Sequence, residues 1–333
     1  MEGVTLLLVV VIVLAVAFDY INGFHDTANA IATSVATRAL HPRQAIVMAA
    51  AFNFIGAFAG TAVAKTIGSG LVQEETTTQG VVVAALVGAI VWNLMTWARG
   101  LPSSSSHALI GGLIGATLIA SGAQALQVDG IVGKVLVPMI VSPLIGFAGA
   151  FGLMLGIYWV FRHAHRRPLG RIFRRVQVVS AGFMAFSHGS NDAQKTMGII
   201  TLALFSAGVI PDVTVPTWVI VVAATALSFG TAIGGWRIMR TMGHRVADLE
   251  PVHGFAAETT AATILFTTAH FGIPVSTTHV ISSAIMGVGS SRGPRGVRWG
   301  VARNILGAWV VTIPAAALVA AATWIGLNLV GLG

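Results

Sequence analysis

A polar cluster interrupts the first apolar segment of the chain. Residues 23–30 read GFHDTANA and follow residues 3–18, which contain no charged side chain. A charged residue at the depth of a lipid bilayer costs at least about 3 kcal/mol. His25, Asp26 and Asn29 therefore predict a functional site, at which a bound cation or proton offsets the charge of the carboxylate.

Two further motifs place hydroxyl groups directly after a proline. Residues 100–107 read GLPSSSSH, and residues 272–279 read GIPVSTTH. Because proline disfavours helix at the residue before it, a helix is expected to begin just after Pro102 and Pro274. A single serine in a membrane helix usually bonds back to its own helix, but a run of hydroxyls at a helix N-terminus suits a small oxyanion. The predicted anion ligands are Ser104, Ser105, Ser106, Ser276, Thr277 and Thr278.

The aspartate motif also has a counterpart in the second half of the chain. Residues 188–196 read HGSNDAQKT, with Gly189 three residues before Asp192, just as Gly23 precedes Asp26. Ionised carboxylates beside an anion repel it strongly at low dielectric constant, which favours cotransport of the anion with cations or protons. The acids within apolar segments and their polar neighbours are the predicted coupling residues: Asp26, Asn29, Asn191, Asp192, Lys195 and Glu258.

Histidines accompany both kinds of motif and are secondary candidates. An imidazole can pass protons near neutral pH, although each of these rings could instead donate to a backbone carbonyl. They are His25, His107, His188 and His279. Further polar residues that could face the same cavity are Asp19 and Asn22 and, more weakly, Asn53 and Asn93. We expect no cofactor and no dedicated metal cluster, but a transported cation is expected near Asp26 and Asp192.

The elements that carry these motifs are predicted to be membrane helices. The chain is 55% hydrophobic and 9% charged, whereas soluble domains are about 25% charged. Its apolar runs are continuous and approach the length of a spanning helix, which barrel strands do not. We therefore expect an all-α polytopic membrane protein. We count about ten apolar stretches that approach the length of a membrane-spanning helix. They lie near 3–34, 44–64, 80–98, 103–121, 135–161, 176–206, 217–236, 253–270, 275–289 and 304–330.

The positive charge predicts an orientation rather than a nucleic-acid partner. Most of the 19 Lys and Arg residues lie in the connections 38–43, 162–175, 237–245 and 292–303, and cytoplasmic loops carry such an excess. Both termini are then outside.

The same orientation divides the chain into two membrane repeats, residues 1–161 and 176–333, joined by a basic cytoplasmic linker at 162–175. The Asp26 segment runs inward and the Asp192 segment runs outward. We therefore predict inverted-topology repeats, with broken helices or hairpins at the midplane, where secondary transporters bind their substrates.

At these residues the sequence resembles the PiT family of inorganic phosphate transporters, most closely the bacterial low-affinity branch. The resembling segments are 23–33, 92–111, 185–199 and 275–287. The resemblance implies a symporter that imports inorganic phosphate by alternating access across the cytoplasmic membrane of a bacterium. It also implies that the two hydroxyl-rich helix starts hold the phosphate, while the paired aspartates handle the coupling cation.

Two departures from the family pattern bear on the coupling ion. His25 stands where the second motif has Asn191, and Lys195 stands where the first motif has Asn29. A tethered ammonium at Lys195 could take the place of one sodium ion, which favours proton coupling, with sodium coupling as the alternative. That phosphate travels as a neutral complex with a divalent metal is implied by the resemblance alone.

Other functional classes are weaker. A channel would not need two buried carboxylates beside an anion site. A hydrolase is disfavoured because the serines lack a Gly-x-Ser-Gly context and a catalytic triad needs convergent geometry, so no enzyme activity is expected. A carrier for another oxyanion, such as sulfate, stays open, although Glu258 could favour phosphate by accepting its O–H. The expected surroundings are a lipid bilayer without nucleic acid, and the sequence leaves homo-oligomer formation open.

Overall fold

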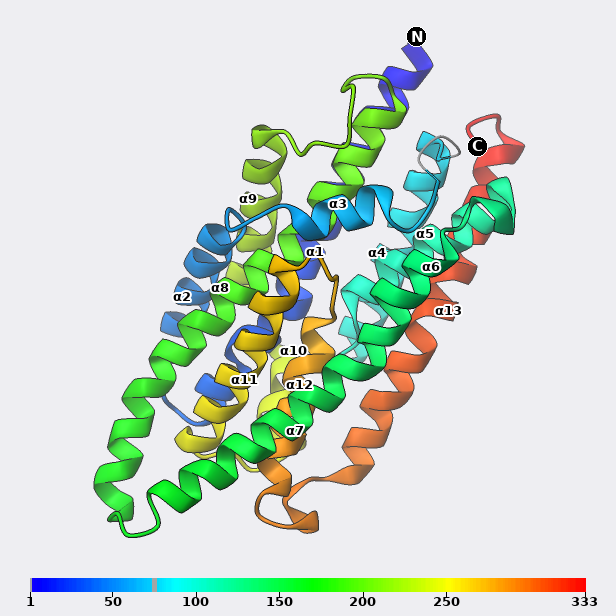
Figure 1. Ribbon diagram of the computed structural model, residues 1–333. Coiled ribbons are helices and arrows are strands. Elements are labelled where there is room, and N and C mark those ends of the chain that lie inside the picture. Colours follow the sequence, from blue (N-terminus) through cyan, green and yellow to red (C-terminus); the bar gives the residue numbers. More distant parts are fainter. Residues whose placement is uncertain (1, 74–76) are drawn as a thin grey trace.

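The computed structural model describes residues 2–73 and 77–333, and these residues form a bundle of helices (Figure 1). Extended pairing in this part of the chain is limited to two isolated antiparallel bridges, Val72 with Leu126 and Ala247 with Val297. The predicted all-α architecture is therefore confirmed. The α-helices are α1 Glu2–Ala36, α2 Pro42–Gly56, α3 Ala62–Ser69, α4 Gln79–Arg99, α5 Ser105–Ser121, α6 Val128–Ile131, α7 Val137–Val160, α8 Arg166–Ser206, α9 Thr217–Ile233, α10 Trp236–Arg240, α11 Pro251–His270, α12 Thr277–Ser290 and α13 Trp299–Leu329.

Every predicted apolar stretch contains a helix, but not every helix is long enough to cross a bilayer. Among the described residues, 4 helices have the required length and composition: Leu6–Ala36, Gln79–Arg99, Val128–Val160 and Trp299–Leu329. The pair Thr217–Ile233 and Trp236–Arg245, bent by 60°, would make a fifth span. Others are shorter, such as α5 with 17 residues and α12 with 14. Short helices of this kind can begin inside the bundle and bring their termini to its middle.

The predicted stretch 44–64 is not one helix. Helix α2 ends at Gly56, and α3 begins only at Ala62 and lies across the bundle (Figure 1). Free N–H groups at the start of α3 would be costly inside the molecule. The side chain of Gln194 in α8 resolves this, because its Oε1 accepts a hydrogen bond from Val63 N at 2.8 Å. A tertiary contact therefore stabilises a break that the apolar pattern does not predict.

The basic segment 162–175, which the sequence predicts as a linker, is not a loop throughout. Helix α8 begins at Arg166, so most of this basic segment is helical. Pro168 falls in the first turn, where its missing N–H would have had no helical partner in any case. The basic side chains of Arg167 and Arg171 are exposed. The segment therefore remains basic and solvent-facing, but it is the start of a helix rather than a loop.

Helices α1 and α8 cross the middle of the bundle in opposite directions. Asn22 of α1 donates to Asp192 of α8 at 3.3 Å, and Asp26 lies beside His188. Residue numbers therefore rise along one helix as they fall along the other. This arrangement brings the two aspartate motifs together. Asp26 and Asp192 are 166 residues apart in the sequence.

Glycines allow the neighbouring helices to approach α1 and α8 closely. A Cβ atom at Gly23 would collide with the carbonyl of Leu227 in α9, and one at Gly189 would collide with the carbonyl of Asn53 in α2. Small residues commonly serve such close helix contacts in membranes. Each aspartate helix therefore packs against the short helix that follows the other aspartate helix in the chain.

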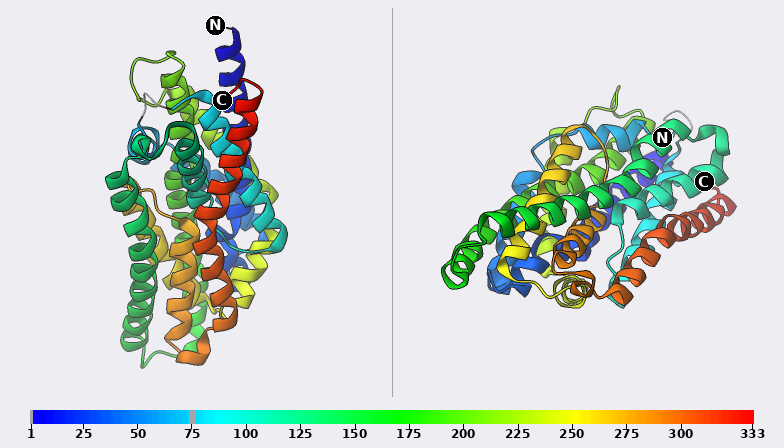
Figure 2. Two further views of the ribbon diagram at one scale, coloured as in Figure 1. Left: turned by 90° about the vertical axis from the view of Figure 1, so that its right-hand side faces the viewer. Right: turned by 60° about the horizontal axis from the view of Figure 1, so that its bottom comes forward.

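The outer surface of the bundle is suited to lipid. Large apolar side chains such as Leu144, Val310 and Leu318 are exposed, whereas a set of polar and charged side chains that includes Asp192, Lys195 and Glu258 is buried in the interior. Both chain ends lie at the same end of the elongated bundle (Figure 2), and the turn between α7 and α8 lies at the opposite end (Figure 1). An apolar exterior around a polar interior is the arrangement expected of a membrane protein with an internal site.

Candidate functional site

The hydroxyl motifs lie at the first turns of two short helices. Ser104 precedes α5, and its side chain accepts a hydrogen bond from His107 N at 3.1 Å. Ser276 precedes α12 and accepts from His279 N at 3.2 Å. Such N-cap bonds satisfy one of the free N–H groups of each helix and leave others available. The predicted helix starts after the two prolines are therefore confirmed.

Each of these helix starts donates a hydroxyl to one aspartate. Ser105 Oγ donates to Asp26 Oδ2 at 3.2 Å, and Thr277 Oγ1 donates to Asp192 Oδ1 at 2.8 Å. All of these side chains are buried. The predicted anion ligands and the predicted coupling acids are therefore in direct contact, once in each half of the chain.

The two helix starts also face each other. Ser106 Oγ donates to the carbonyl of Val275 at 3.5 Å, and the rings of His107 and His279 meet edge to face with centroids 4.7 Å apart. His279 stacks on Trp309 at 3.9 Å. The hydroxyls of both motifs consequently surround one region, while these two histidines line the contact between the helices.

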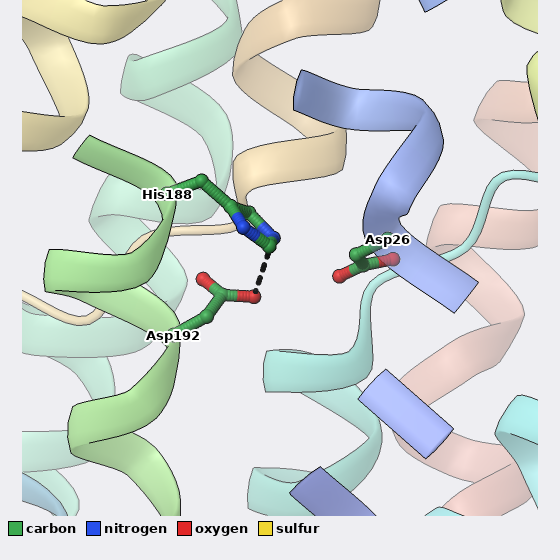
Figure 3. Close-up of side chains that lie close together, drawn as sticks. All are labelled: Asp26, His188 and Asp192. Atoms are coloured by element: carbon green, nitrogen blue, oxygen red, sulfur yellow. Dashed lines mark ion pairs between the residues drawn. The ribbon is translucent and has the colours of Figure 1, made fainter. Parts of the chain in front are cut away.

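Asp26 and Asp192 share a cluster with His188. The potential ligand atoms of these side chains all lie within 4.8 Å of one another. Figure 3 shows the carboxylates approaching the same space from α1 and α8, with His188 Nε2 3.5 Å from Asp192 Oδ2. Carboxylate oxygens suit hard cations. This cluster is therefore where the chain could hold a transported cation, close to the hydroxyl motifs.

The two aspartates differ in how their charge is balanced. Lys195 Nζ lies 2.5 Å from Asp192 Oδ1, and both side chains are essentially inaccessible to solvent. Asn191 also donates to Asp192 Oδ1 at 2.9 Å. Asp26 has no such ammonium in the described structure; its Oδ1 lies 2.6 Å from His25 Nδ1. A fixed positive charge compensates one aspartate, and an imidazole that can be neutral or charged accompanies the other.

Two residues that were not predicted extend this network. Thr96 Oγ1 lies 3.1 Å from His25 Nε2, and Ser103 donates to Thr96 Oγ1 at 2.8 Å. Thr96 lies three residues after Asn93 in a helix that is otherwise apolar between its terminal residues Gln79 and Arg99, and this spacing places the two polar residues on one helix face. This spacing is the feature of the sequence from which Thr96 could have been predicted as a site residue. The predicted residue Asn29 reaches across instead and donates to Thr278 Oγ1 of α12 at 2.9 Å.

Glu258 lies apart from the other predicted coupling residues. Its Oε1 accepts from Thr33 at 2.5 Å and Gln177 at 3.1 Å, and its Oε2 accepts from Ser180 at 2.5 Å. None of these partners belongs to either hydroxyl motif. The structure therefore places this acid in a second polar cluster between α1, α8 and α11. Its partners were not predicted, because isolated hydroxyl and amide residues in apolar helices are common.

Fold and site together define a helical membrane transporter. Ionisable side chains inside a bundle with an apolar exterior mark a path for polar solutes, and helices that start at the middle of the bundle supply an anion-binding end. The model of the phosphate transporter family matches residues 22–320 of the chain. The chain belongs to this family of transporters, which are not enzymes.

Relatives and a solved structure agree with this assignment. A protein of Bacillus subtilis described as a "Probable low-affinity inorganic phosphate transporter" is 46% identical over 333 residues, which cover 99% of this chain and 100% of the relative. A protein of Rhizobium meliloti with the same description is 48% identical over 326 residues, 97% of each chain. A solved structure described as "The sodium-dependent phosphate transporter" matches with a TM-score of 0.89 and 25% identity, covering 97% of this chain and 99% of that one.

Proposed function

We propose that this chain is a secondary active symporter that imports inorganic phosphate together with protons across the cytoplasmic membrane of a bacterium. The descriptions of the Bacillus subtilis and Rhizobium meliloti relatives support inorganic phosphate as the substrate. The observation that carries the mechanism is the pairing of each hydroxyl motif with one aspartate, Ser105 with Asp26 and Thr277 with Asp192.

This pairing links phosphate binding to cation binding. A hydroxyl has one proton to donate, so Thr277 can donate it to Asp192 or to a phosphate oxygen, but not fully to both. An ionised aspartate holds the hydroxyl and repels the anion. When a proton or cation neutralises the aspartate, the hydroxyl is released for phosphate. The ligands we propose for phosphate are Ser104–Ser106 and Ser276–Thr278, with the free N–H groups of α5 and α12.

The proton is favoured as the coupling ion by the buried ammonium of Lys195. Lys195 already supplies Asp192 with a positive charge at 2.5 Å, so one cation position beside this aspartate is filled by the protein itself. Sodium is the second candidate. It is favoured by the similarity to a solved transporter described as sodium-dependent and by the cluster of Asp26, His188 and Asp192, which could hold a cation.

Alternating access is proposed from the correspondence between residues 1–161 and 176–333. Both halves contain an N-capping serine followed by a hydroxyl bonded to an aspartate, at Ser104 and Ser276. The antiparallel bridges likewise occur once in each half. Inverted-topology repeats around a midplane site rock or gate relative to each other in secondary transporters. In this arrangement the basic segment 162–175 is cytoplasmic and both termini are outside.

Uptake into liposomes tests the proposal. Purified protein is reconstituted, and accumulation of radiolabelled phosphate is measured with an inward proton gradient, with an inward sodium gradient, and with each of these in the presence or absence of magnesium. We expect the proton gradient alone to drive saturable uptake. If sodium drives uptake and protons do not, the coupling ion is sodium rather than the proton. Absence of both gradient-driven uptake and phosphate counterflow would reject the symporter.

Two finer features are tested in the same vesicles. A strict requirement for magnesium would support transport of phosphate as a metal complex, and equal uptake without it would reject that form of the substrate. Unlabelled sulfate at equal concentration should compete weakly, because phosphate can donate through its own O–H and sulfate at neutral pH cannot. Equal competition by sulfate would make the site a general oxyanion site.

A further inference from the structure

Asp19 is a buried acid that the site described above does not use. It lies in α1, two helical turns before Asp26, and its side chain is 0% exposed. Neither of its carboxylate oxygens accepts a hydrogen bond from any residue in the described part of the chain. Thr196 and Asn22 are its polar neighbours and stabilise its charged form weakly, but no hydrogen bond of ordinary geometry joins either of them to a carboxylate oxygen of Asp19.

The other acids in the interior have the partners that Asp19 lacks. Asp26 is 2.6 Å from an imidazole nitrogen, Asp192 is 2.5 Å from an ammonium, and Glu258 accepts from hydroxyl and amide groups. An ionised carboxylate without a partner is far more costly to bury than a neutral carboxylic acid. A bound proton is the simplest way for Asp19 to be stable where it lies.

The charged groups that face Asp19 both belong to α8. They are Asp192 and Lys195, and each interacts with it electrostatically. Helix α9, which also packs on α1, contains no ionisable residue, and the only one in α4 is Arg99 in its last turn. One ammonium is thus available to two carboxyl groups. It can fully compensate only one ionised acid, so the other is stabilised by a proton.

We propose that Asp19 is the proton-carrying carboxyl of the transport cycle, a role that rests on the proton coupling proposed above. In the conformation described here, Asp19 holds the proton and Lys195 pairs with Asp192 alone. The ammonium therefore neutralises Asp192, and Thr277 can turn its hydroxyl to phosphate when phosphate enters. When phosphate is released, the proton leaves Asp19 for the cytoplasmic water, and the Lys195 ammonium is then shared by both carboxylates. Asp19 takes up a new proton from the outer water before the next phosphate enters.

Removal of the acid tests this role directly. Asp19→Asn keeps the size and the neutral state of the protonated side chain but cannot release a proton. For each proton carried with phosphate, a pH difference of one unit supports an accumulation ratio of about tenfold. We expect Asp19→Asn to lose this accumulation while still exchanging labelled for unlabelled phosphate. Asp19→Glu should retain proton-driven accumulation, and Asp212→Asn, at an exposed loop acid, should behave as the unchanged protein.

The outcomes separate this inference from the proposed function. If the unchanged protein is driven by sodium and not by protons, both the proton coupling and the role of Asp19 are rejected. If the unchanged protein is proton-driven and Asp19→Asn accumulates phosphate equally well, only the role of Asp19 is rejected.

A second measurement does not depend on the folding of a variant. Dicyclohexylcarbodiimide reacts with protonated carboxyls in apolar surroundings, and mass spectrometry of the unchanged protein locates the adduct. We expect labelling at Asp19 at neutral pH that falls as the pH rises. Labelling at Glu258 or Asp26 with none at Asp19 would show that another acid holds the proton.

Discussion

Replacement of Thr277 by valine should weaken phosphate binding without disturbing the fold. Valine has the shape of threonine but lacks the hydroxyl that donates to Asp192 at 2.8 Å. On the mechanism proposed here, this hydroxyl passes to phosphate when the aspartate is neutralised. A hydrogen bond to a charged group contributes about 1.5–3 kcal/mol, so the dissociation constant for phosphate should rise by a factor of about 10–150.

The assay is titration of the purified protein with phosphate, accompanied by initial uptake rates in liposomes. Thr201→Val is the matched control, because Thr201 is equally buried but its hydroxyl donates to Met197 O within its own helix at 2.7 Å. Thr277→Ser should restore most of the affinity, since it returns the hydroxyl. If Thr277→Val and Thr201→Val bind phosphate equally tightly, the hydroxyl of Thr277 does not hold phosphate, and the proposed link between the aspartate and the anion is wrong.

Two further substitutions test interactions that stabilise the site, namely the ion pair of Lys195 with Asp192 and the close helix contact at Gly189. Lys195→Met should lower the free energy of unfolding by about 3–5 kcal/mol, because it leaves Asp192 buried without its ammonium; thermal unfolding in detergent measures the loss, and adding Asp192→Asn should recover part of it. Gly189→Ala should destabilise the protein by about 1–3 kcal/mol, because its Cβ would collide with the carbonyl of Asn53. Gly152→Ala is the control, since a Cβ there meets nothing within 4 Å, and equal melting temperatures for the two variants would contradict the close contact.

The local features of the site could be predicted because they depend on neighbouring residues. Proline at positions 102 and 274 disfavours helix before it, and a serine two residues later is suited to cap the helix that follows. The structure has Ser104 and Ser276 in these capping positions. The long apolar runs likewise predicted helices, since in lipid a helix satisfies its own backbone groups.

The ends of helices were predicted less well where they depend on a contact with a residue far away in the chain. The break between α2 and α3 depends on Gln194, which is far away in the chain and satisfies the N–H group of Val63. The helical start of α8 at Arg166 could not be distinguished from a loop by charge, because exposed basic residues are common in both.

The sequence by itself determined the chemical groups of this protein, their positions relative to helix starts, and the apolar segments that carry them. Only the tertiary structure decided which of these groups meet. Asn29 reaches Thr278 across the two halves, Glu258 has partners of its own, and Asp19 has none among the described residues. The physical reason is that a side chain's direction follows from local backbone geometry, whereas its partner depends on how helices far apart in the chain cross.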